Sequence, residues 1–401
     1  MKVLSIAHSL LRHDSPHGGG QTYAYYMSKI AEDPSIELHV ICMCSPMDKD
    51  KAEFDRFNST GELLFTKGGV FRNVKRILLD LYGKAFRKTY IDSYFKHHEY
   101  INAVRRLRLK GYIPDVIILE WTQCVSLVEE IKSIFPNAKI VASEHDVMFL
   151  SYERKAELTK DNEAKHSQAL TLARRVKKEE IEALTKCDVV MPHNLKDRDL
   201  LVQNGIPLQS IHPITAFFHD YCSVSRSEFG HDLLFWGAMS RPENYNAAIW
   251  FIKNVMPLIS DLNTRFVVVG NRPDKSLLDE ATDRVVITGF VEDPIPYFEN
   301  SLCLCAPLLV GAGIKIKIME ALSAGIPVLT NEIGIEGIPA KDGIDYCHCK
   351  KPEDYEQIIR ELVADREKCQ LLSRNGRGVI KKHFNLERSA SDYLEMLHSL
   401  T

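Results

Sequence analysis

The chain lacks an apolar run long enough to cross a bilayer, so its sequence predicts no transmembrane helix. The first eight residues, 1–8, turn polar too soon for a signal peptide and favour a first buried strand instead. Without an export signal, the ten cysteines are expected to be free thiols rather than disulfides. These features predict a cytoplasmic protein.

The chain also lacks a strong charge of either sign. Its formal net charge is −3, which gives no general attraction to nucleic acid. We find no internal repeat, coiled coil or low-complexity tract. With 45% hydrophobic and 26% charged residues, the composition is that of an ordinary globular protein. The length of 401 residues exceeds what one hydrophobic core usually serves, so two domains are expected.

Two kinds of site are disfavoured by missing motifs. The segment Ser15–Tyr23 contains three glycines but not Gly-x-Gly-x-x-Gly, and no acidic residue ends the second strand, which argues against a dinucleotide site. Cys347-His348-Cys349 could hold a metal, but its alternation suits a strand and no second ligand cluster lies nearby in the sequence. We therefore predict no metal site.

Short β-branched runs alternate with helical stretches throughout the chain, which predicts an α/β fold with doubly wound parallel sheets. A linker near residues 210–231 separates two such series, so we expect two Rossmann-like domains, 1–210 and 211–384, followed by a terminal helix, 385–401. The predicted strands are 3–7, 37–43, 116–120, 139–143 and 189–192, then 233–236, 265–269, 285–288, 302–306 and 327–330.

A glycine-rich turn follows the predicted strand 302–306. Gly311 and Gly313 let the backbone approach a ligand closely, and a helix is expected to begin near Ile314. A helix start offers N–H groups and a positive dipole end, for which a diphosphate is the natural guest. The turn and helix, up to Gly325, therefore predict a diphosphate site.

Charged residues of this helix strengthen the prediction. Lys315 and Lys317 place positive charge in the expected first turn, which is unfavourable for the helix itself and indicates a bound anion. Glu320 lies one turn deeper, where its carboxylate could accept hydrogen bonds from ribose hydroxyls. The alternative is a plain β-α-β crossover with a solvated lysine pair.

A second strand-loop-helix unit begins the predicted second domain. Gly237 permits a tight turn after the strand 233–236, and Arg241 is a candidate cation for the diphosphate. Asn244 could cap the helix or orient the loop. The alternative is an ordinary turn with a capping asparagine.

Two features of the first domain also follow predicted strands. Gly19 and Gly20 open a helix, either as a ligand-contacting turn or as a tight turn without a ligand. His145 follows the strand 139–143 directly, and a neutral imidazole there could accept a hydrogen bond from a hydroxyl, oriented by a neighbouring acid, Glu144 or Asp146. His193 follows another strand and is a weaker candidate.

The segments 233–246 and 302–330 resemble the donor-binding stretches of glycosyltransferase family 4, the glycosyl transferases group 1, which have the GT-B fold. The resemblance implies two facing Rossmann-like domains with a cleft between them and a terminal helix that crosses back to the first domain. Glu320 matches the second glutamate of the family's Glu-x7-Glu pattern, but Ala312 replaces the first. Donor-sugar identity is therefore not carried over.

The resemblance also implies roles for the remaining residues. Gly19 and Gly20 would touch the donor phosphate and the acceptor, and His145 would contact the reacting end of the donor sugar. The backbone at Phe290 and Val291 would meet the nucleobase, whose identity stays open.

The implied activity is that of a retaining glycosyltransferase with a nucleoside-diphosphate sugar as donor and no obligatory metal or cofactor. Its acceptor would be a glycan or a lipid-linked hydroxyl, in polysaccharide or glycolipid assembly. Two alternatives stay open: a sugar-nucleotide epimerase of the same fold, and a partner protein that kept the fold without the chemistry.

The segment 67–110 differs in charge from the rest of the chain. It contains twelve Lys or Arg against three Asp or Glu, and apolar residues recur at roughly helical spacing between Val70 and Phe86. This pattern is compatible with contact to the inner face of an anionic membrane or to an anionic acceptor. Because the pattern alone is unspecific, it favours the alternative, a solvated charged face on helices that pack inside the domain.

Overall fold

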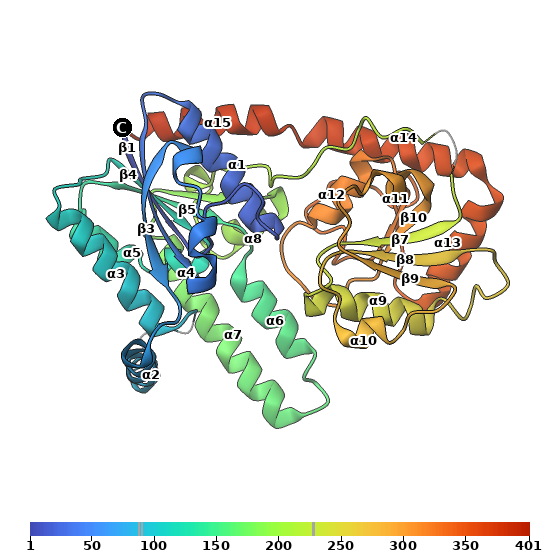
Figure 1. Ribbon diagram of the computed structural model, residues 1–401, viewed down its shortest axis with the longest axis horizontal. Coiled ribbons are helices and arrows are strands. Elements are labelled where there is room, and N and C mark those ends of the chain that lie inside the picture. Colours follow the sequence, from blue (N-terminus) through green and yellow to red (C-terminus); the bar gives the residue numbers. More distant parts are fainter. Residues whose placement is uncertain (87–88, 90, 227–228) are drawn as a thin grey trace. The chain divides into compact units, whose positions relative to one another are not determined.

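The computed structural model describes residues 1–86, 89, 91–226 and 229–401, and divides into two compact units (Figure 1). Unit 1 comprises Met1–Phe217 with Leu386–Thr401, and unit 2 comprises Phe218–Asn385. Arg87 and Lys88, two cations of the basic segment, lie outside the described residues. Each unit is built on one six-stranded parallel sheet with helices around it, which confirms the predicted α/β class.

The sheet of unit 1 has the strand order β3-β2-β1-β4-β5-β6. Alternate residues of β1 enter two different cores. Leu4 and Ile6 pack with helices α3 (Tyr94–Leu109), α5 (Val128–Ile134) and α7 (Glu163–Leu184), whereas Val3 and Ala7 pack with α1 (Gly18–Glu32) and α15 (Leu386–Ser399). Both faces are therefore covered, which explains the near-continuous apolar character of the strands. The strands are β1 (Lys2–Ala7), β2 (Glu37–Cys44), β3 (Ser59–Phe65), β4 (Val116–Glu120), β5 (Lys139–Glu144) and β6 (Val189–Pro192).

The helices of unit 1 connect these strands. Helix α1 (Gly18–Glu32) joins β1 to β2, and α15 (Leu386–Ser399) packs beside it, where Tyr26 Oη lies 2.7 Å from Ser389 Oγ. The others are α2 (Val70–Ala85), α3 (Tyr94–Leu109), α4 (Thr122–Val125), α5 (Val128–Ile134), α6 (Met148–Glu157), α7 (Glu163–Leu184) and α8 (Leu195–Gln203), with short 3-10 helices η1 (Pro46–Lys51), η2 (Asp55–Phe57) and η3 (Leu208–Ser210).

The sheet of unit 2 has the strand order β12-β11-β10-β7-β8-β9. Its strands are β7 (Asp232–Trp236), β8 (Arg265–Val269), β9 (Val285–Gly289), β10 (Ser301–Ala306), β11 (Val328–Thr330) and β12 (Cys347–His348). Its helices are α9 (Pro242–Asn254), α10 (Lys275–Leu278), α11 (Ile295–Asn300), α12 (Ile316–Ser323), α13 (Pro352–Ala364) and α14 (Arg366–His383).

All ten predicted strands are present, and β12 coincides with Cys347-His348-Cys349, whose alternation suited a strand. The sequence missed β3. This strand pairs only with β2 at the edge of its sheet, and most of its residues are partly or wholly exposed. It therefore lacks the apolar run by which buried strands are recognised. In the part of the chain that the structure describes, no helix combines the length and the apolar character that a bilayer crossing requires.

Candidate active site

The glycine-rich turn of unit 2 leads from β10 into α12. Gly311 and Gly313 have φ values of +133° and +71°, which side chains other than glycine rarely adopt. Helix α12 begins at Ile316 rather than near Ile314, because Lys315 has an extended backbone and occupies the capping position. Lys315 makes no side-chain capping bond, so its side chain leaves the first turn of α12 uncapped.

Lys315 is tied to the loop from which the helix starts. Its ammonium donates to the carbonyl of Ala312 at 3.2 Å and to that of Gly313, and it lies 3.5 Å from the buried carboxylate of Glu336. Its charge is thus already engaged within the loop. This arrangement corrects the prediction that Lys315 and Lys317 form an equivalent pair in the first turn, because only Lys317 lies within the helix.

Lys317 connects α12 to the turn after β7. Its Nζ donates to the side-chain oxygen of Asn244 and lies 5.1 Å from the ring centre of Phe235. Asn244 in turn donates to the carbonyl of Ala238 at 2.8 Å. Desolvation, aided by the charge of Arg241, lowers the pKa of Lys317 to about 7. An anion placed beside Lys317 would therefore stabilise its charged ammonium form.

Gly237 makes the approach of Lys317 feasible. Its φ is +150°, and its N–H donates to the carbonyl of Val269 at 3.0 Å. A Cβ at this position would meet Nζ and Cε of Lys317 at 3.3 Å. The predicted tight turn is therefore also the place where α12 and the β7 loop come together.

Glu320 is buried one turn beyond Lys317. Its carboxylate accepts a hydrogen bond from Trp236 Nε1 at 2.8 Å and one from the backbone N–H of His219 at 3.4 Å. Burial raises the pKa of Glu320 to about 7, against the lowering effect of the bond from Trp236. The sequence analysis did not identify Trp236 as a partner of Glu320. Trp236 ends β7, which pairs with β10, the strand that leads into α12.

The remaining predicted donor residues of unit 2 follow strands β7 and β9. Arg241 occupies the capping position of α9, pairs with Glu243, and keeps 55% of its side chain exposed. Phe290 and Val291 follow the edge strand β9, and Phe290 is 75% exposed. Arg241 and Phe290 thus present side chains to solvent.

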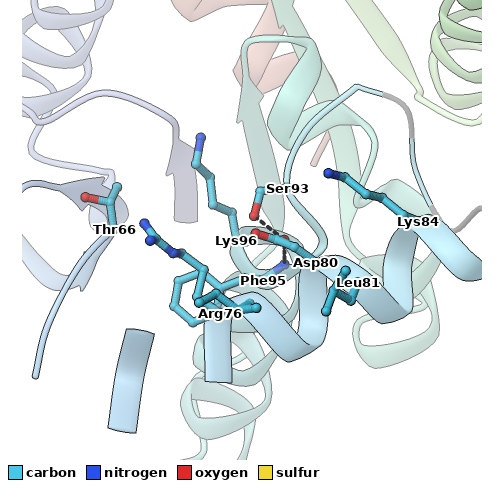
Figure 2. Close-up of a pocket in the computed structure, with 9 residues that line it drawn as sticks. Thr66, Arg76, Asp80, Leu81, Lys84, Ser93, Phe95 and Lys96 are labelled. Atoms are coloured by element: carbon cyan, nitrogen blue, oxygen red, sulfur yellow. Dashed lines mark hydrogen bonds between the residues drawn. The ribbon is translucent and has the colours of Figure 1, made fainter. Parts of the chain in front are cut away.

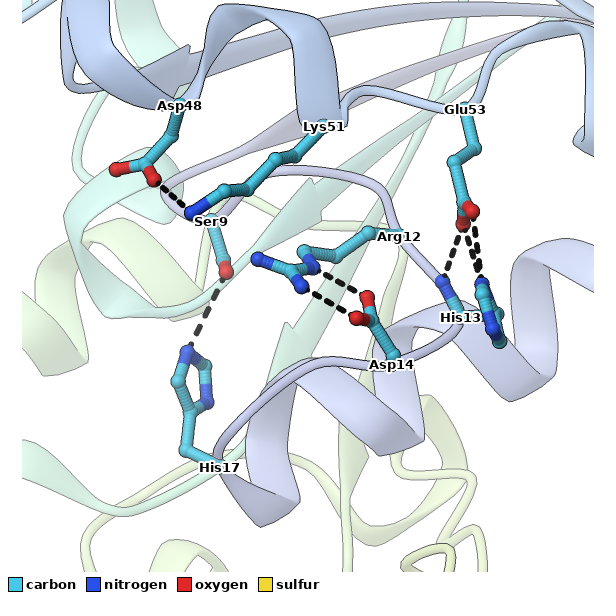
Figure 3. A network of polar contacts seen from close by, with 8 residues as sticks. All are labelled: Ser9, Arg12, His13, Asp14, His17, Asp48, Lys51 and Glu53. Carbon is cyan, nitrogen blue, oxygen red and sulfur yellow. Dashed lines mark hydrogen bonds and ion pairs between the residues drawn. The ribbon is translucent and has the colours of Figure 1, made fainter. Parts of the chain in front are cut away.

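In unit 1, the loop from β1 to α1 is held by a set of polar contacts (Figure 3). Arg12 donates twice to Asp14, each at 2.5 Å, and His13 Nδ1 lies 2.8 Å from the carboxylate of Glu53. At the end of the loop, His17 Nδ1 accepts a hydrogen bond from the N–H of Gly20 at 3.0 Å and so caps α1. The cap at His17 therefore sets the start of helix α1 at Gly18.

Gly19 and Gly20 belong to the first turn of α1 rather than to a turn before the helix, which corrects the expectation of a glycine turn. A Cβ at Gly20 would lie 2.0 Å from Ser15 Oγ, so no larger residue fits without a shift. A Cβ at Gly19 would lie 3.3 Å from both His145 Nδ1 and Trp121 Nε1. The glycines allow α1 to pack against the carboxyl ends of β4 and β5.

His145 is buried at the end of β5. Its Nε2 lies 2.9 Å from a carboxylate oxygen of Glu120, which ends the adjacent strand β4. The acid that bonds to the ring is therefore neither of the two predicted, Glu144 or Asp146; Glu144 accepts a hydrogen bond from Thr122 at 2.7 Å. Glu120 could not be paired with His145 from the sequence, because the contact depends on which strands are neighbours.

Burial determines the protonation of this pair. It lowers the pKa of His145 to about 3, with a further lowering by His17, and it raises the pKa of Glu120 to about 8. Both shifts favour the uncharged forms, so the pair is neutral near pH 7. Among the described residues, His145 Nδ1 has no hydrogen-bond partner.

Two aromatic rings fix the plane of His145. The Trp121 ring stacks on it with centroids 4.0 Å apart and an interplanar angle of 11°, and His193 meets it edge-on at 4.3 Å. Trp121 has a φ of +66°, a strained value for a large side chain. His193 is also buried, with its pKa lowered well below the usual value by burial. The imidazole of His145, at the end of β5, is thus oriented by groups at the ends of β4 and β6.

A known protein family matches part of unit 2. Residues 230–365 match the family model for Glycosyl transferases group 1, so this part of the chain is a group 1 glycosyltransferase domain. The family indicated by the segments 233–246 and 302–330 is confirmed.

Solved structures resemble the chain over nearly its whole length. Sucrose-phosphate synthase from Thermosynechococcus elongatus has a TM-score of 0.69 at 14% identity, covering 100% of this chain and 98% of that chain. Anabaena Alr3699/HepE in complex with UDP-glucose has a TM-score of 0.64 at 13% identity, covering 100% of both chains. TarM, from S. aureus, has a TM-score of 0.65 at 12% identity, covering 98% of both. These likenesses confirm the GT-B fold class.

A curated relative matches only in part. It is described as an uncharacterized 44.6 kDa protein in the cps region of Klebsiella pneumoniae, and it is 24% identical over 123 residues. The match covers 28% of this chain and 32% of that protein, so the chain spans about a third of the length of the curated relative it matches.

Proposed function

We propose that this chain, with its group 1 glycosyltransferase domain, transfers a sugar from a nucleoside-diphosphate sugar to a hydroxyl acceptor. Unit 2 would hold the donor and unit 1 the acceptor. One observation carries the proposal: Lys317 and the buried Glu320 lie together on the helix that follows the glycine turn. The pKa of Lys317 is lowered, so its positive charge is unfavourable unless an anion lies beside it. Such a pair suits a ligand with an anionic centre next to hydroxyl groups.

The diphosphate would bind at the start of α12. There the helix dipole and Lys317 offer positive charge, and the conformations of Gly311 and Gly313 let the backbone come close. Arg241 is exposed and can leave Glu243 for a phosphate, since a surface ion pair is weak. These groups would stabilise the charge that develops on the leaving diphosphate.

Glu320 would accept hydrogen bonds from the ribose hydroxyls. Trp236 holds one of its oxygens through Nε1 at 2.8 Å, which fixes the plane of the carboxylate. Phe290 and Val291 would then meet the nucleobase. The base is left open, although Anabaena Alr3699/HepE is described in complexes with UDP and with UDP-glucose.

His145 would contact the reacting end of the donor sugar from unit 1. Its lowered pKa keeps the imidazole neutral, so the ring can exchange hydrogen bonds with hydroxyls without carrying charge. Gly19 and Gly20 would lie beside it. We infer a retaining reaction without an obligatory metal, because the family resemblance implies both and the cations of unit 2 can neutralise the leaving group.

We further infer a role in polysaccharide or glycolipid assembly, with a glycan or a lipid-linked acceptor, on the cytoplasmic side of a membrane. Two similar proteins support an acceptor of this kind. S. aureus TarM is described in a complex with alpha-GlcNAc-glycerol and UDP, and the Klebsiella relative is named for its place in the cps region.

A thermal-shift screen against UDP-, GDP-, ADP- and dTDP-sugars tests the donor proposal. At least one nucleotide sugar should raise the melting temperature by several degrees, about the shift expected at ligand concentrations well above Kd. That nucleotide sugar should then be hydrolysed slowly without acceptor. Epimerisation of its sugar in the absence of acceptor would indicate the epimerase alternative, and the absence of any shift would contradict the proposal.

A further inference from the structure

Helix α2 exposes its apolar side to solvent. Seven apolar or aromatic residues of α2, and Phe86 directly after it, have exposed fractions of 44 to 94%. Among the residues of the helix, only Gly83 is buried. Their spacing of three or four residues places them on one continuous side of the helix. The exposed residues are Val70, Phe71, Val74, Ile77, Leu78, Leu81, Tyr82 and, just after the helix, Phe86.

The polar side of α2 faces the protein instead. Arg72 donates to Glu99 of α3 at 2.6 Å and to the carbonyl of Phe65 at 2.7 Å. Asp80 accepts from Ser93 Oγ at 2.6 Å and from the N–H of Phe95 at 3.0 Å. The usual arrangement of an amphipathic helix is thus reversed, and these contacts hold the apolar side outward.

Close packing at one end of the helix secures the same orientation. A Cβ at Gly83 would lie 2.4 Å from Cβ of Tyr94, so the backbone of α2 lies directly on the start of α3. Lys75 adds an ion pair to Glu99 at 2.8 Å. The exposed apolar side is therefore part of the folded unit. The alternative of a solvated charged face over packed helices fits α3, which buries its apolar residues, but it does not fit α2.

Positive charge surrounds the apolar side. Lys67, Lys75 and Lys84 are exposed on or beside α2, and the segment 67–110 has twelve Lys or Arg against three Asp or Glu. A second copy of the chain would bring two such surplus charges together, which disfavours self-association through α2. An anionic bilayer offers both an apolar interior and negative headgroups.

A pocket of about 390 Å³ lies between α2 and the start of α3 (Figure 2). Its lining combines the cations Arg76, Lys84 and Lys96 with Ile77 and Leu81 of the exposed apolar side. Figure 2 shows these cations around the pocket, while Asp80 is bonded to Ser93. The pocket thus places positive charge next to the apolar surface.

We propose that α2 lies in the interface of an anionic lipid bilayer, with its apolar side among the acyl chains and the cations of the pocket at the headgroup phosphates. The helix would lie along the membrane surface and position unit 1 there. This inference is independent of the donor chemistry proposed for unit 2.

Co-sedimentation of the full chain with vesicles tests the proposal. Vesicles of equal parts phosphatidylglycerol and phosphatidylcholine should bind the protein, whereas pure phosphatidylcholine should bind it at least about tenfold more weakly. Added salt should weaken binding to the anionic vesicles. The double variant Phe71→Ser/Leu78→Ser should reduce binding by about tenfold or more.

The matched control is Leu371→Ser, which removes a leucine that is 48% exposed on α14 of unit 2. It should bind vesicles like the unaltered chain. Circular dichroism shows whether the double variant is folded. A second variant, Lys84→Glu, leaves the apolar side intact and should also weaken binding to anionic vesicles.

Unchanged binding by a folded double variant, or no binding of the unaltered chain to anionic vesicles, would overturn the proposal. A dimer of the unaltered chain that the double variant loses, without vesicle binding, would assign the surface to self-association instead. Because no nucleotide sugar is present, failure here is separate from failure of the donor proposal.

Discussion

The two units place ionisable groups at equivalent positions, beyond the carboxyl ends of parallel strands, but with different electrostatic character. In unit 1, His145 and Glu120 face each other as an uncharged pair among aromatic rings. In unit 2, Lys317 and Glu320 lie about one turn apart on α12, and each has a pKa of about 7. The first arrangement suits hydrogen bonds to hydroxyls, and the second suits a ligand that is anionic and hydroxylated.

The comparison predicts that unit 1 controls turnover and unit 2 controls donor affinity. His145→Ala should lower turnover of the nucleotide sugar selected by the thermal-shift screen by about 10²- to 10⁴-fold, because it removes a group that contacts the reacting end. Calorimetric donor affinity should change by less than about threefold. Steady-state kinetics and calorimetry check the two quantities separately.

The control for this variant is His39→Ala, which removes an imidazole on β2 that is hydrogen-bonded to Thr60 of β3. Its turnover should match that of the unaltered chain. If turnover of His145→Ala were also unchanged, we would withdraw the role of His145.

Lys317→Met tests the cation of unit 2. Donor affinity should fall by about tenfold to a hundredfold, since a charge-assisted bond to the diphosphate is lost while an apolar chain of similar length remains. The matched control is Lys253→Met, whose exposed ammonium pairs with Glu280 on the surface at 2.9 Å. Equal calorimetric affinities for the two variants would exclude Lys317 from the donor site.

The candidate sites of the two units show how much of each could be predicted from the sequence. The segment 302–330 carries turn, helix and Glu320 in one stretch of chain, so its arrangement could be predicted without knowing the sheet order. The site of unit 1 gathers Glu120, Trp121, His145 and His193 from three strand ends, and only the pairing of β4, β5 and β6 brings them together. The sequence therefore indicated His145 but assigned it the wrong acid.

The outward-facing side of α2 shows a different limit. Helical spacing identifies an apolar stripe but not the direction in which it points, and the partly buried contacts of Arg72 and Asp80 decide that direction. The exact start of α12 was beyond prediction for a similar reason, because Lys315 bonds to loop carbonyls instead of continuing the helix.

Glu320→Ala should weaken donor binding by about tenfold, because bonds from the ribose hydroxyls to a carboxylate are lost. Trp236→Phe keeps the carboxylate but removes the bond from Nε1, so its effect should be about threefold. Calorimetry of both variants measures this difference. Wild-type affinity in Glu320→Ala would rule out the ribose role.

The smallest expected effect is the pH dependence of donor affinity. Lys317, with its pKa lowered to about 7, loses its charge as pH rises, and Glu320, with its pKa raised to about 7, loses its charge as pH falls. Affinity should therefore peak near pH 7 and fall about threefold one pH unit to either side. Titrations should show that Lys317→Met abolishes the alkaline fall and Glu320→Gln the acid one; a flat profile in the unaltered chain would argue against both roles.

Hydrogen exchange with and without the selected nucleotide sugar tests the central claim most directly. The sugar nucleotide should protect the amides from Gly311 to Glu320 and those around Gly237, and protection should be weaker in Lys317→Met at a ligand concentration near the Kd of the unaltered chain. Protection that leaves the segment 311–320 unchanged while ligand binding is saturated would contradict the assignment of α12 as the donor site.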